Sequence, residues 1–334
     1  MCPDSERLQR ESCGDLNEFE ISSTSSLKLP SGQFRTVRHT SALLAVKKFR
    51  RCAAGRDIAE DAQSTVRDAE TLTQTMNYLV NVVMFRELSK TLDPFQVDKL
   101  YNFLDDRFRA IRQDALCQQI FSESFVYILE IQIVIHIFAL SHLIEGTSYG
   151  FNRKLCLDQI SQCYSTLFAT YEKVQGKNQH EFTAGFILLN INSDNLATIV
   201  INNRLPVRSM LQQQVYLLLA LWKTGGYVFF ASVVSQLPSI VNFFADAIVS
   251  KFYARALEAL NVTFSSKEPF SIPNLQTSFQ GLEDLRLICS ECGLDIQNDA
   301  VTFKNSNFKN ELGHVRLLNP ESINKMEAVI LSLR

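Results

Sequence analysis

The sequence is poor in the two residues that most often interrupt helices. Its 334 residues include only 12 glycines and 8 prolines, which is roughly half of the usual share of each. Because glycine and proline punctuate secondary structure, a chain with so few of them, and with many Leu, Ala, Gln and Ile, is expected to be mainly helical. The length allows two domains or one extended helical-repeat structure.

The chain also lacks a marked excess of charge of either sign. Lys and Arg together number 33, Asp and Glu together number 35, and the net charge is −2. Overall charge therefore does not indicate a nucleic-acid-binding protein or a protein of the membrane surface, and any basic function must be local. The opening residues, MCPDSERLQRE, lack the apolar core of a signal peptide. We therefore expect a reducing compartment, the cytosol or nucleus, with free thiols.

Motifs for metal binding and catalysis are scarce. Cys289 and Cys292 form the only CxxC pair among eight cysteines, and His314 is the only histidine after residue 180. A structural zinc site needs four ligands, so we interpret the pair as one buried and one half-exposed thiol of a helix, with a metal or redox role as the weaker alternative. We find no Gly-rich phosphate loop, HExxH, GxSxG or ordered Ser/His/Asp set. We predict no catalytic residue, no metal site and no cofactor, hence no enzyme.

Two long apolar runs have the length of membrane-spanning helices but not their composition. The first covers residues 125–144 and contains Glu130; the second covers residues 215–249 and is interrupted by Lys223 and Pro238. A carboxylate within a lipid-exposed span is costly, whereas a buried helix tolerates one that has a partner. Both runs are therefore predicted to be core helices of a soluble protein.

The central part of the chain has the periodicity of successive helices. A first helix, with Ser41 as its N-cap and Gly55 as its stop, is expected at residues 41–54. Further helices are expected at residues 68–89, 95–120, 122–145, 151–174, 179–192, 208–223, 226–236 and 239–263. The short links between them favour a bundle or an α-solenoid.

The pattern changes after about residue 264. Ser271 and Pro273 mark the start of a helix, and GLEDLRLICSECG is a second helix that ends at Gly293. LDIQNDAVTFKN then alternates around an Asn-Asp turn, which is typical of a β-hairpin. The predicted fold is mainly α, a helical-repeat stack followed by a small α/β winged helix. The predicted domains are an irregular N-terminal segment (1–40), a helical-repeat domain (41–245), a winged-helix end (246–318) and a C-terminal helix (319–334).

The segment DDRFRAIRQD concentrates charge of both signs on one predicted helix. Leu104, Phe108, Ile111 and Ala115 make an apolar stripe, and the charged residues flank it. Charge spacing alone favours a solvated face. We predict instead a structural role, in which the stripe packs and Arg107 and Arg112 reach carboxylates or carbonyl ends of neighbouring helices. The residues of this predicted charge network are Asp105, Arg107, Arg109, Arg112 and Asp114.

Two basic segments are candidates for binding nucleic acid or an acidic partner. Residues 35–56 hold seven Lys and Arg and no acid, and the predicted helix 41–54 places its cations opposite Ala42, Val46, Phe49 and Ala53. The alternative is a solvated face or an internal partner of acidic helices. The winged-helix end offers fewer cations, and there we favour protein pairing, which would use apolar groups such as Val301, Phe303 and Phe308 if these are exposed. The candidate binding residues are Lys47, Lys48, Arg50, Arg51, Lys304, Lys309 and Arg316.

Four ordered segments resemble motifs of the GANP (germinal-centre-associated nuclear protein), or SAC-homology-domain, family. DDRFRAIRQD is similar to the family's D-R-x-R-x-I-R-Q-D helix, and MCPDSERLQRE shares Cys2, Pro3, Glu6 and Arg10 with its N-terminal motif. AVKKFRRCAAGRD resembles its basic segment, with Cys52 in place of the usual Ser. Residues 151–191 resemble its F-N and E-F stretches. The resemblance covers most of the chain.

The resemblance implies a scaffold of an mRNA-export complex. Such a scaffold pairs a helical PCI-type module, ending in a winged helix, with a second PCI-domain subunit and a small acidic peptide subunit. It also implies a surface for an RNA or DNA backbone contact and a nuclear location, and the Glu130 argument above predicts no membrane. The alternative is the family's short member, which the chain resembles in size, acting in centrosome duplication and mitotic spindle organisation, with centrosome, spindle and cytoplasmic locations.

Overall fold

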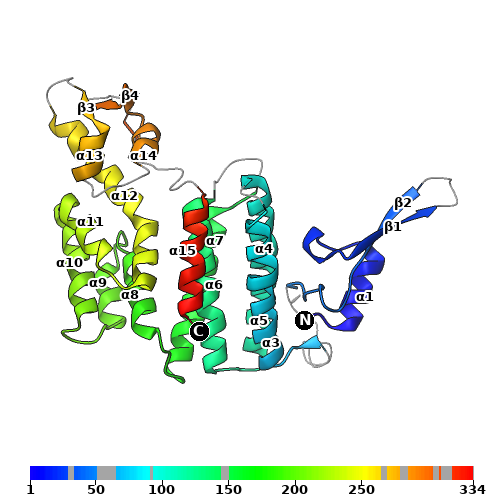
Figure 1. The fold of residues 1–334 in the computed structure, drawn as a ribbon. Coiled ribbons are helices and arrows are strands. Elements are labelled where there is room, and N and C mark those ends of the chain that lie inside the picture. Colours follow the sequence, from blue (N-terminus) through cyan, green and yellow to red (C-terminus); the bar gives the residue numbers. More distant parts are fainter. Residues whose placement is uncertain are drawn as a thin grey trace. The chain divides into compact units, whose positions relative to one another are not determined.

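The chain folds into two compact units, residues 1–128 and 129–334 (Figure 1). The computed structural model describes residues 1–28, 34–50, 65–90, 93–143, 150–264, 269–278, 285–303, 308–309 and 318–333. Helices dominate both units, and each unit holds one small antiparallel sheet. The predicted fold class, a helical stack with a small α/β region, is confirmed. The predicted domain boundaries remain predictions.

The N-terminal 40 residues are more ordered than the sequence indicates. They form helix α1 (Asp4–Cys13), the 3-10 turn η1 (Glu18–Glu20) and an antiparallel pair of strands, β1 (Ser23–Lys28) and β2 (Phe34–His39). Gly14 ends α1 in the left-handed conformation, with φ 72°. The predicted irregular segment is therefore wrong here: the Ser-rich strand carries no apolar period of its own and is defined by pairing with β2.

The first unit also contains a pair of long helical rods. Residues 69–88 form one rod, made of α3 (Ala69–Asn77), the π-helical segment η2 (Tyr78–Met84) and α4 (Phe85–Leu88), and it packs against α5 (Pro94–Cys117). Asp68 and Asp93 cap the two rods, accepting hydrogen bonds from backbone N–H groups of their first turns. These helices were predicted correctly, within a few residues at each end.

Helix α6 (Glu123–His142) is the apolar run that has the length of a membrane span. It is the one helix of the described residues that is long and apolar enough to cross a membrane, and 89% of its most apolar window is buried within the protein. In the second unit the Glu130 carboxylate on α6 accepts hydrogen bonds from Tyr171 Oη at 2.8 Å and Asn178 Nδ2 at 2.9 Å. The burial and partnering of this carboxylate agree with the prediction of a core helix.

The second unit is built around the long helix α12 (Ser239–Thr263). Its other large helices are α7 (Arg153–Tyr171), α8 (Gln179–Leu189), α9 (Leu196–Asn202), α10 (Met210–Thr224) and α11 (Tyr227–Ser235). Helix α12 packs on α8 and α11, and α10 packs on both α8 and α11. Only α9 was not predicted, because its seven residues, LATIVIN, are too few and too rich in β-branched side chains to show a helical period.

A small α/β module and a last helix complete the second unit. The module runs β3 (Phe270–Ser271), α13 (Ile272–Ser278), α14 (Leu285–Glu291), β4 (Asp295–Gln297) and β5 (Ala300–Thr302), and its sheet has the order β3-β5-β4. The turn at Asn298 and Asp299, with φ values of 47° and 61°, joins β4 to β5 as predicted. Helix α15 (Pro320–Ser332) packs on α12.

Candidate functional site

Residues 41–50, here called the strap, do not form the predicted helix. They run without regular secondary structure, apart from a turn at residues 42–44, and Ala45 and Val46 are fully buried. The remainder of the predicted helix lies outside the described residues. The strap carries the first part of the family-like basic motif. The contacts of the strap residues therefore show which groups of that motif are buried and which reach solvent.

Glu20, in the 3-10 turn after α1, is a buried carboxylate that connects the strap to the helices of the first unit. Its Oε1 accepts the backbone N–H of Val46 at 2.8 Å, and its Oε2 is 2.7 Å from Arg107 Nη2 on α5. Arg10, on α1, forms a second ion pair with Glu20 and donates to the Val46 carbonyl at 2.9 Å. Burial by itself would lower the pKa of Arg10, but the hydrogen bond to Glu20 raises it above its ordinary value. One carboxylate thus joins α1, the strap and α5.

Asp114 is a second buried carboxylate with two cationic partners. Lys47 Nζ lies 2.6 Å from its Oδ1, and Arg67 Nε lies 2.7 Å from its Oδ2. Lys47 also donates to the Thr65 carbonyl at 3.0 Å. All three residues are buried. Buried charges persist in proteins when they are paired and hydrogen-bonded in this way.

Side chains also hold the backbone of the outer part of the strap. Glu6 on α1 accepts the Lys48 N–H at 2.9 Å, and Asp106 on α5 accepts the Phe49 N–H at 3.2 Å. Gln113 donates to the Arg50 carbonyl at 3.1 Å. A helix would use these backbone groups for its own hydrogen bonds. In the strap these groups instead bond to carboxylates and an amide that come from other elements.

The predicted charge network lies on α5 and faces the protein interior. Asp105, Arg107, Arg112 and Asp114 are buried, and Arg109 is partly exposed with its guanidinium 4.0 Å from the centre of the Phe49 ring. The solvated face that charge spacing alone favours is therefore wrong. Burial raises the pKa of Asp105 to about 6, even though Arg112 and Arg109 oppose the shift. These charged side chains therefore form part of the packed interior of the first unit.

The four basic candidates of the strap region have different environments. Lys47 is buried against Asp114, so its placement on an exposed basic face is corrected. Lys48 is partly exposed and pairs with Asp15 at 3.1 Å. Arg50 is exposed and donates to the Gln9 side chain at 3.3 Å. Arg51 lies outside the described residues.

The candidates of the C-terminal module divide in the same way. Lys309 is exposed, and its backbone N–H donates to the Cys292 carbonyl at 2.9 Å. Lys304 and Arg316 lie outside the described residues. Val301 and Phe303 are fully buried, and Phe308 is partly buried against the same apolar core. These three apolar residues belong to the core of the unit, so the exposure that their use in protein pairing requires is not found.

The CxxC pair lies inside the same core. Cys289 and Cys292 are both fully buried, so the expectation of one half-exposed thiol is wrong. Burial raises the pKa of Cys289 to about 12 and that of Cys292 to about 11, which keeps both as neutral thiols. Within the residues that the structure describes, no group of three or more His, Cys, Asp or Glu is placed to hold a metal ion.

The structure places one polar relay that the sequence did not reveal. Ser25 Oγ lies 2.8 Å from His39 Nε2, and His39 Nδ1 lies 2.8 Å from Glu11 Oε1. This is the bonding order of a Ser-His-Glu triad. Triad chemistry also needs donors for an oxyanion and a hollow for the substrate, whereas Ser25 stands on an exposed strand. We interpret the relay as an anchor between the hairpin and α1.

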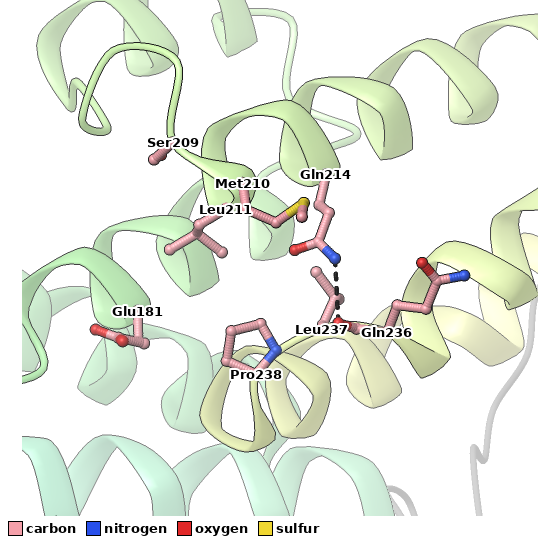
Figure 2. Close-up of a pocket in the computed structure, with 8 residues that line it drawn as sticks. All are labelled: Glu181, Ser209, Met210, Leu211, Gln214, Gln236, Leu237 and Pro238. Carbon is pink, nitrogen blue, oxygen red and sulfur yellow. Dashed lines mark hydrogen bonds between the residues drawn. The ribbon is translucent and has the colours of Figure 1, made fainter.

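A hollow of about 630 Å³ lies in the second unit (Figure 2). Its walls come from the start of α8, the start of α10 and the link between α11 and α12. Gln214 on α10 donates to the Gln236 carbonyl at 3.1 Å across one side of it. Its lining residues are Glu181, Ser209, Met210, Leu211, Gln214, Gln236, Leu237 and Pro238.

Comparison with known proteins agrees with the motif resemblance. SAC3 family protein B of Arabidopsis thaliana is 33% identical over 204 residues, which cover 57% of this chain and 10% of that protein. Protein xmas of Drosophila melanogaster is 26% identical over 197 residues, covering 57% of this chain and 9% of that protein. SAC3 family protein 1 of Schizosaccharomyces pombe is 27% identical over 197 residues, covering 57% and 17%. The chain thus spans less than a fifth of each of these relatives.

The family model supplies the broader match. Residues 1–298 match the model of the SAC3/GANP family, a range that includes the strap, α5 and most of the C-terminal module. The chain therefore belongs to the SAC3/GANP family.

Proposed function

We propose that this protein is a non-catalytic scaffold that docks PCI-type partner subunits in a nuclear complex for transcription and mRNA export. Family membership over residues 1–298 supports the scaffold role. The main observation behind the proposal is that charged residues of the family-like motifs form their bonds inside the protein. Glu6, Arg10, Lys47, Arg107 and Asp114 bond to other groups inside the first unit. Polar groups committed in this way stabilise a platform and leave no free acid, base or nucleophile among them.

We propose that the C-terminal module is the winged helix of a PCI-type domain. Its support is the order of its elements, a short strand and two helices followed by a two-stranded hairpin, with β3 pairing to β5. The helices packed around α12 would then be the helical-repeat part of the same domain. The proposed partners are a second PCI-domain subunit and a small acidic peptide subunit.

We also propose that the exposed cations of the two basic segments contact a nucleic-acid backbone. Lys48, Arg50 and Lys309 are the described candidates whose side chains reach solvent. Contacts of this kind give affinity without base preference and weaken as salt rises. Lys47 is excluded from this surface, because its charge is used by Asp114.

The scaffold proposal is tested by purifying a tagged full chain from nuclei of an asynchronous culture and from a whole-cell extract of a mitotic culture. A PCI-domain subunit is expected to co-purify in stoichiometric amount, and the tag is expected to lie in the nucleus. If no PCI-domain subunit co-purifies in either culture, the proposal is wrong. If in addition the tag collects at spindle poles in mitosis, the result favours the alternative role in centrosome duplication and spindle organisation.

A further inference from the structure

Helices α9 to α11 present large apolar side chains to solvent. Val207, in the link between α9 and α10, is 82% exposed, and Met210 on α10 and Phe229 on α11 are 73% and 70% exposed. Helices α10 and α11 lie side by side in Figure 1 and pack on each other. Further exposed apolar residues of these helices are Ile201, Tyr216, Leu217 and Val228. Exposed apolar side chains of this size on neighbouring helices are the kind of group that a partner protein covers.

The hollow of Figure 2 adjoins this surface at the start of α10. Met210 belongs both to the exposed set and to the wall of the hollow, where Leu211, Leu237 and Pro238 provide the other apolar atoms. Its volume of about 630 Å³ is enough for one large apolar side chain of a partner. An apolar anchor that enters a pocket, surrounded by polar contacts, is the usual arrangement at the centre of an interface.

Apart from Glu181 in the wall of the hollow, the charged residues that the α9–α11 stretch contributes are of one sign. No Asp or Glu occurs between Asp194 and Asp246, whereas Arg204, Arg208 and Lys223 fall within that stretch. Arg204 and Arg208 are exposed, and neither forms an ion pair with any residue that the structure describes. The positive end of the α10 dipole lies at Met210, beside Arg208. The surface therefore combines apolar contact area with unneutralised positive charge.

We propose that the α9–α11 surface binds an acidic amphipathic helix of a partner protein. The partner places one apolar side chain in the hollow beside Met210 and lays its carboxylates against Arg204 and Arg208. This is the helix-in-groove mode of recognition. The proposal deepens the scaffold function, on which it rests, by naming one docking surface and the chemistry of what it takes.

Glu181 sets the orientation of the bound helix. Its half-buried carboxylate lines the hollow on the side away from Gln214, as Figure 2 shows, and it has no ion-pair partner in the described part of the chain. A carboxylate of the partner would be repelled there. The acidic edge of the partner helix must therefore face the Arg204 and Arg208 side, with a donor group facing Glu181.

Anisotropy titration of the full chain with two fluorescein-labelled peptides tests this proposal. The first peptide has two heptads with leucine on one face and glutamate on the other; the second has lysine in place of every glutamate. The variants are Arg208→Glu and Met210→Ser, and the control is Lys154→Glu, which reverses an exposed charge on α7. All three positions are exposed, and equal thermal melting of the variants shows that they fold.

The acidic peptide is expected to bind saturably and the basic peptide to bind at least tenfold more weakly. Arg208→Glu should weaken binding about fivefold, because it exchanges one attractive contact for a repulsive one. Met210→Ser should weaken it at least threefold, and Lys154→Glu by less than twofold. Absent binding of the acidic peptide, equal binding of both peptides, or equal effects of control and test variants would overturn the proposal. If the peptide binds as expected but no PCI-domain subunit co-purifies from nuclei, the surface stands and only the scaffold assignment falls.

Discussion

Single residues in the first unit stabilise it through shared buried charges. Glu20 is fully buried and accepts from two arginines and two backbone N–H groups, and Asp114 serves a lysine and an arginine. Removing one member of such a set leaves the others as buried charges without full compensation, which is costlier than the loss of a surface pair. Substitution of these residues should therefore lower the free energy of unfolding strongly, and more strongly where the side chain is more deeply buried.

Arg107→Ala should destabilise the first unit by about 3 kcal/mol, because Glu20 and Asp106 both lose a cationic partner. The measurement is thermal unfolding followed by circular dichroism, where the shift should be several degrees. Arg109→Ala is the matched control on the same helix, since Arg109 is partly exposed and stacks on Phe49. Equal small shifts for the two variants would show that Glu20 does not depend on Arg107.

Asp105 should make stability fall as pH rises. Its pKa is raised by burial from 3.8 to about 6, so the folded state favours the neutral acid. The stabilising contribution is complete below about pH 4 and is lost as pH rises through about 6. Asp105→Asn stays neutral and should be more stable than the parent chain at pH 7.5, by up to about 3 kcal/mol. Urea unfolding of both proteins at pH 4.5 and 7.5 measures this; a variant-to-parent difference that does not change with pH contradicts it.

At the scale of elements, the sequence predicted the helices whose stabilising features lie within their own segments. The helical rod at residues 69–88 and helices α5, α8, α10 and α12 are rich in apolar residues within their own sequences, and the rod, α5 and α10 also begin at a side-chain N-cap. The prediction of a helix at the strap was wrong. AVKKF has a helical spacing, but the carboxylates that bond its backbone, Glu6, Glu20 and Asp106, are distant in the sequence. The β1–β2 hairpin was not predicted for the same reason, since a Ser-rich strand is stabilised by pairing with another strand.

Gly185 shows how one scarce glycine sets the approach of two helices. A Cβ built at this position of α8 would lie 2.0 Å from Cδ2 of the buried Phe244 ring on α12. Alanine favours a helix over glycine by about 1 kcal/mol, but overpacking here should outweigh this gain. Gly185→Ala is expected to lower the stability of the second unit by about 1–2 kcal/mol in urea unfolding. Phe244→Leu combined with it should cost less than the sum of the single changes; strict additivity would mean that the two residues do not compete for space.

At the scale of the whole molecule, the two units bury charge to different extents. The first buries several ion pairs around the strap, and the second is dominated by one large apolar cluster, with Glu130 held by Tyr171 and Asn178. The sequence predicted the helical class, the charged segment and the C-terminal hairpin. It did not predict which cations are buried, because that depends on carboxylates that folding brings from other elements. Lys47 and Lys48 are adjacent in sequence, yet only Lys48 is partly exposed.

That difference gives a test of nucleic-acid binding by the complete chain, whose net charge of −2 offers no general attraction to polyanions. The double variant Lys48→Glu/Arg50→Glu should keep its melting temperature and bind single-stranded RNA more weakly. The slope of log affinity against log salt should fall by about 1.4, or about 0.7 for each lost phosphate contact. Lys154→Glu is the surface control, and Lys47→Glu should lower the melting temperature because it places a carboxylate against Asp114. An unchanged salt slope in the double variant would remove Lys48 and Arg50 from any nucleic-acid contact and leave the strap as a purely structural element.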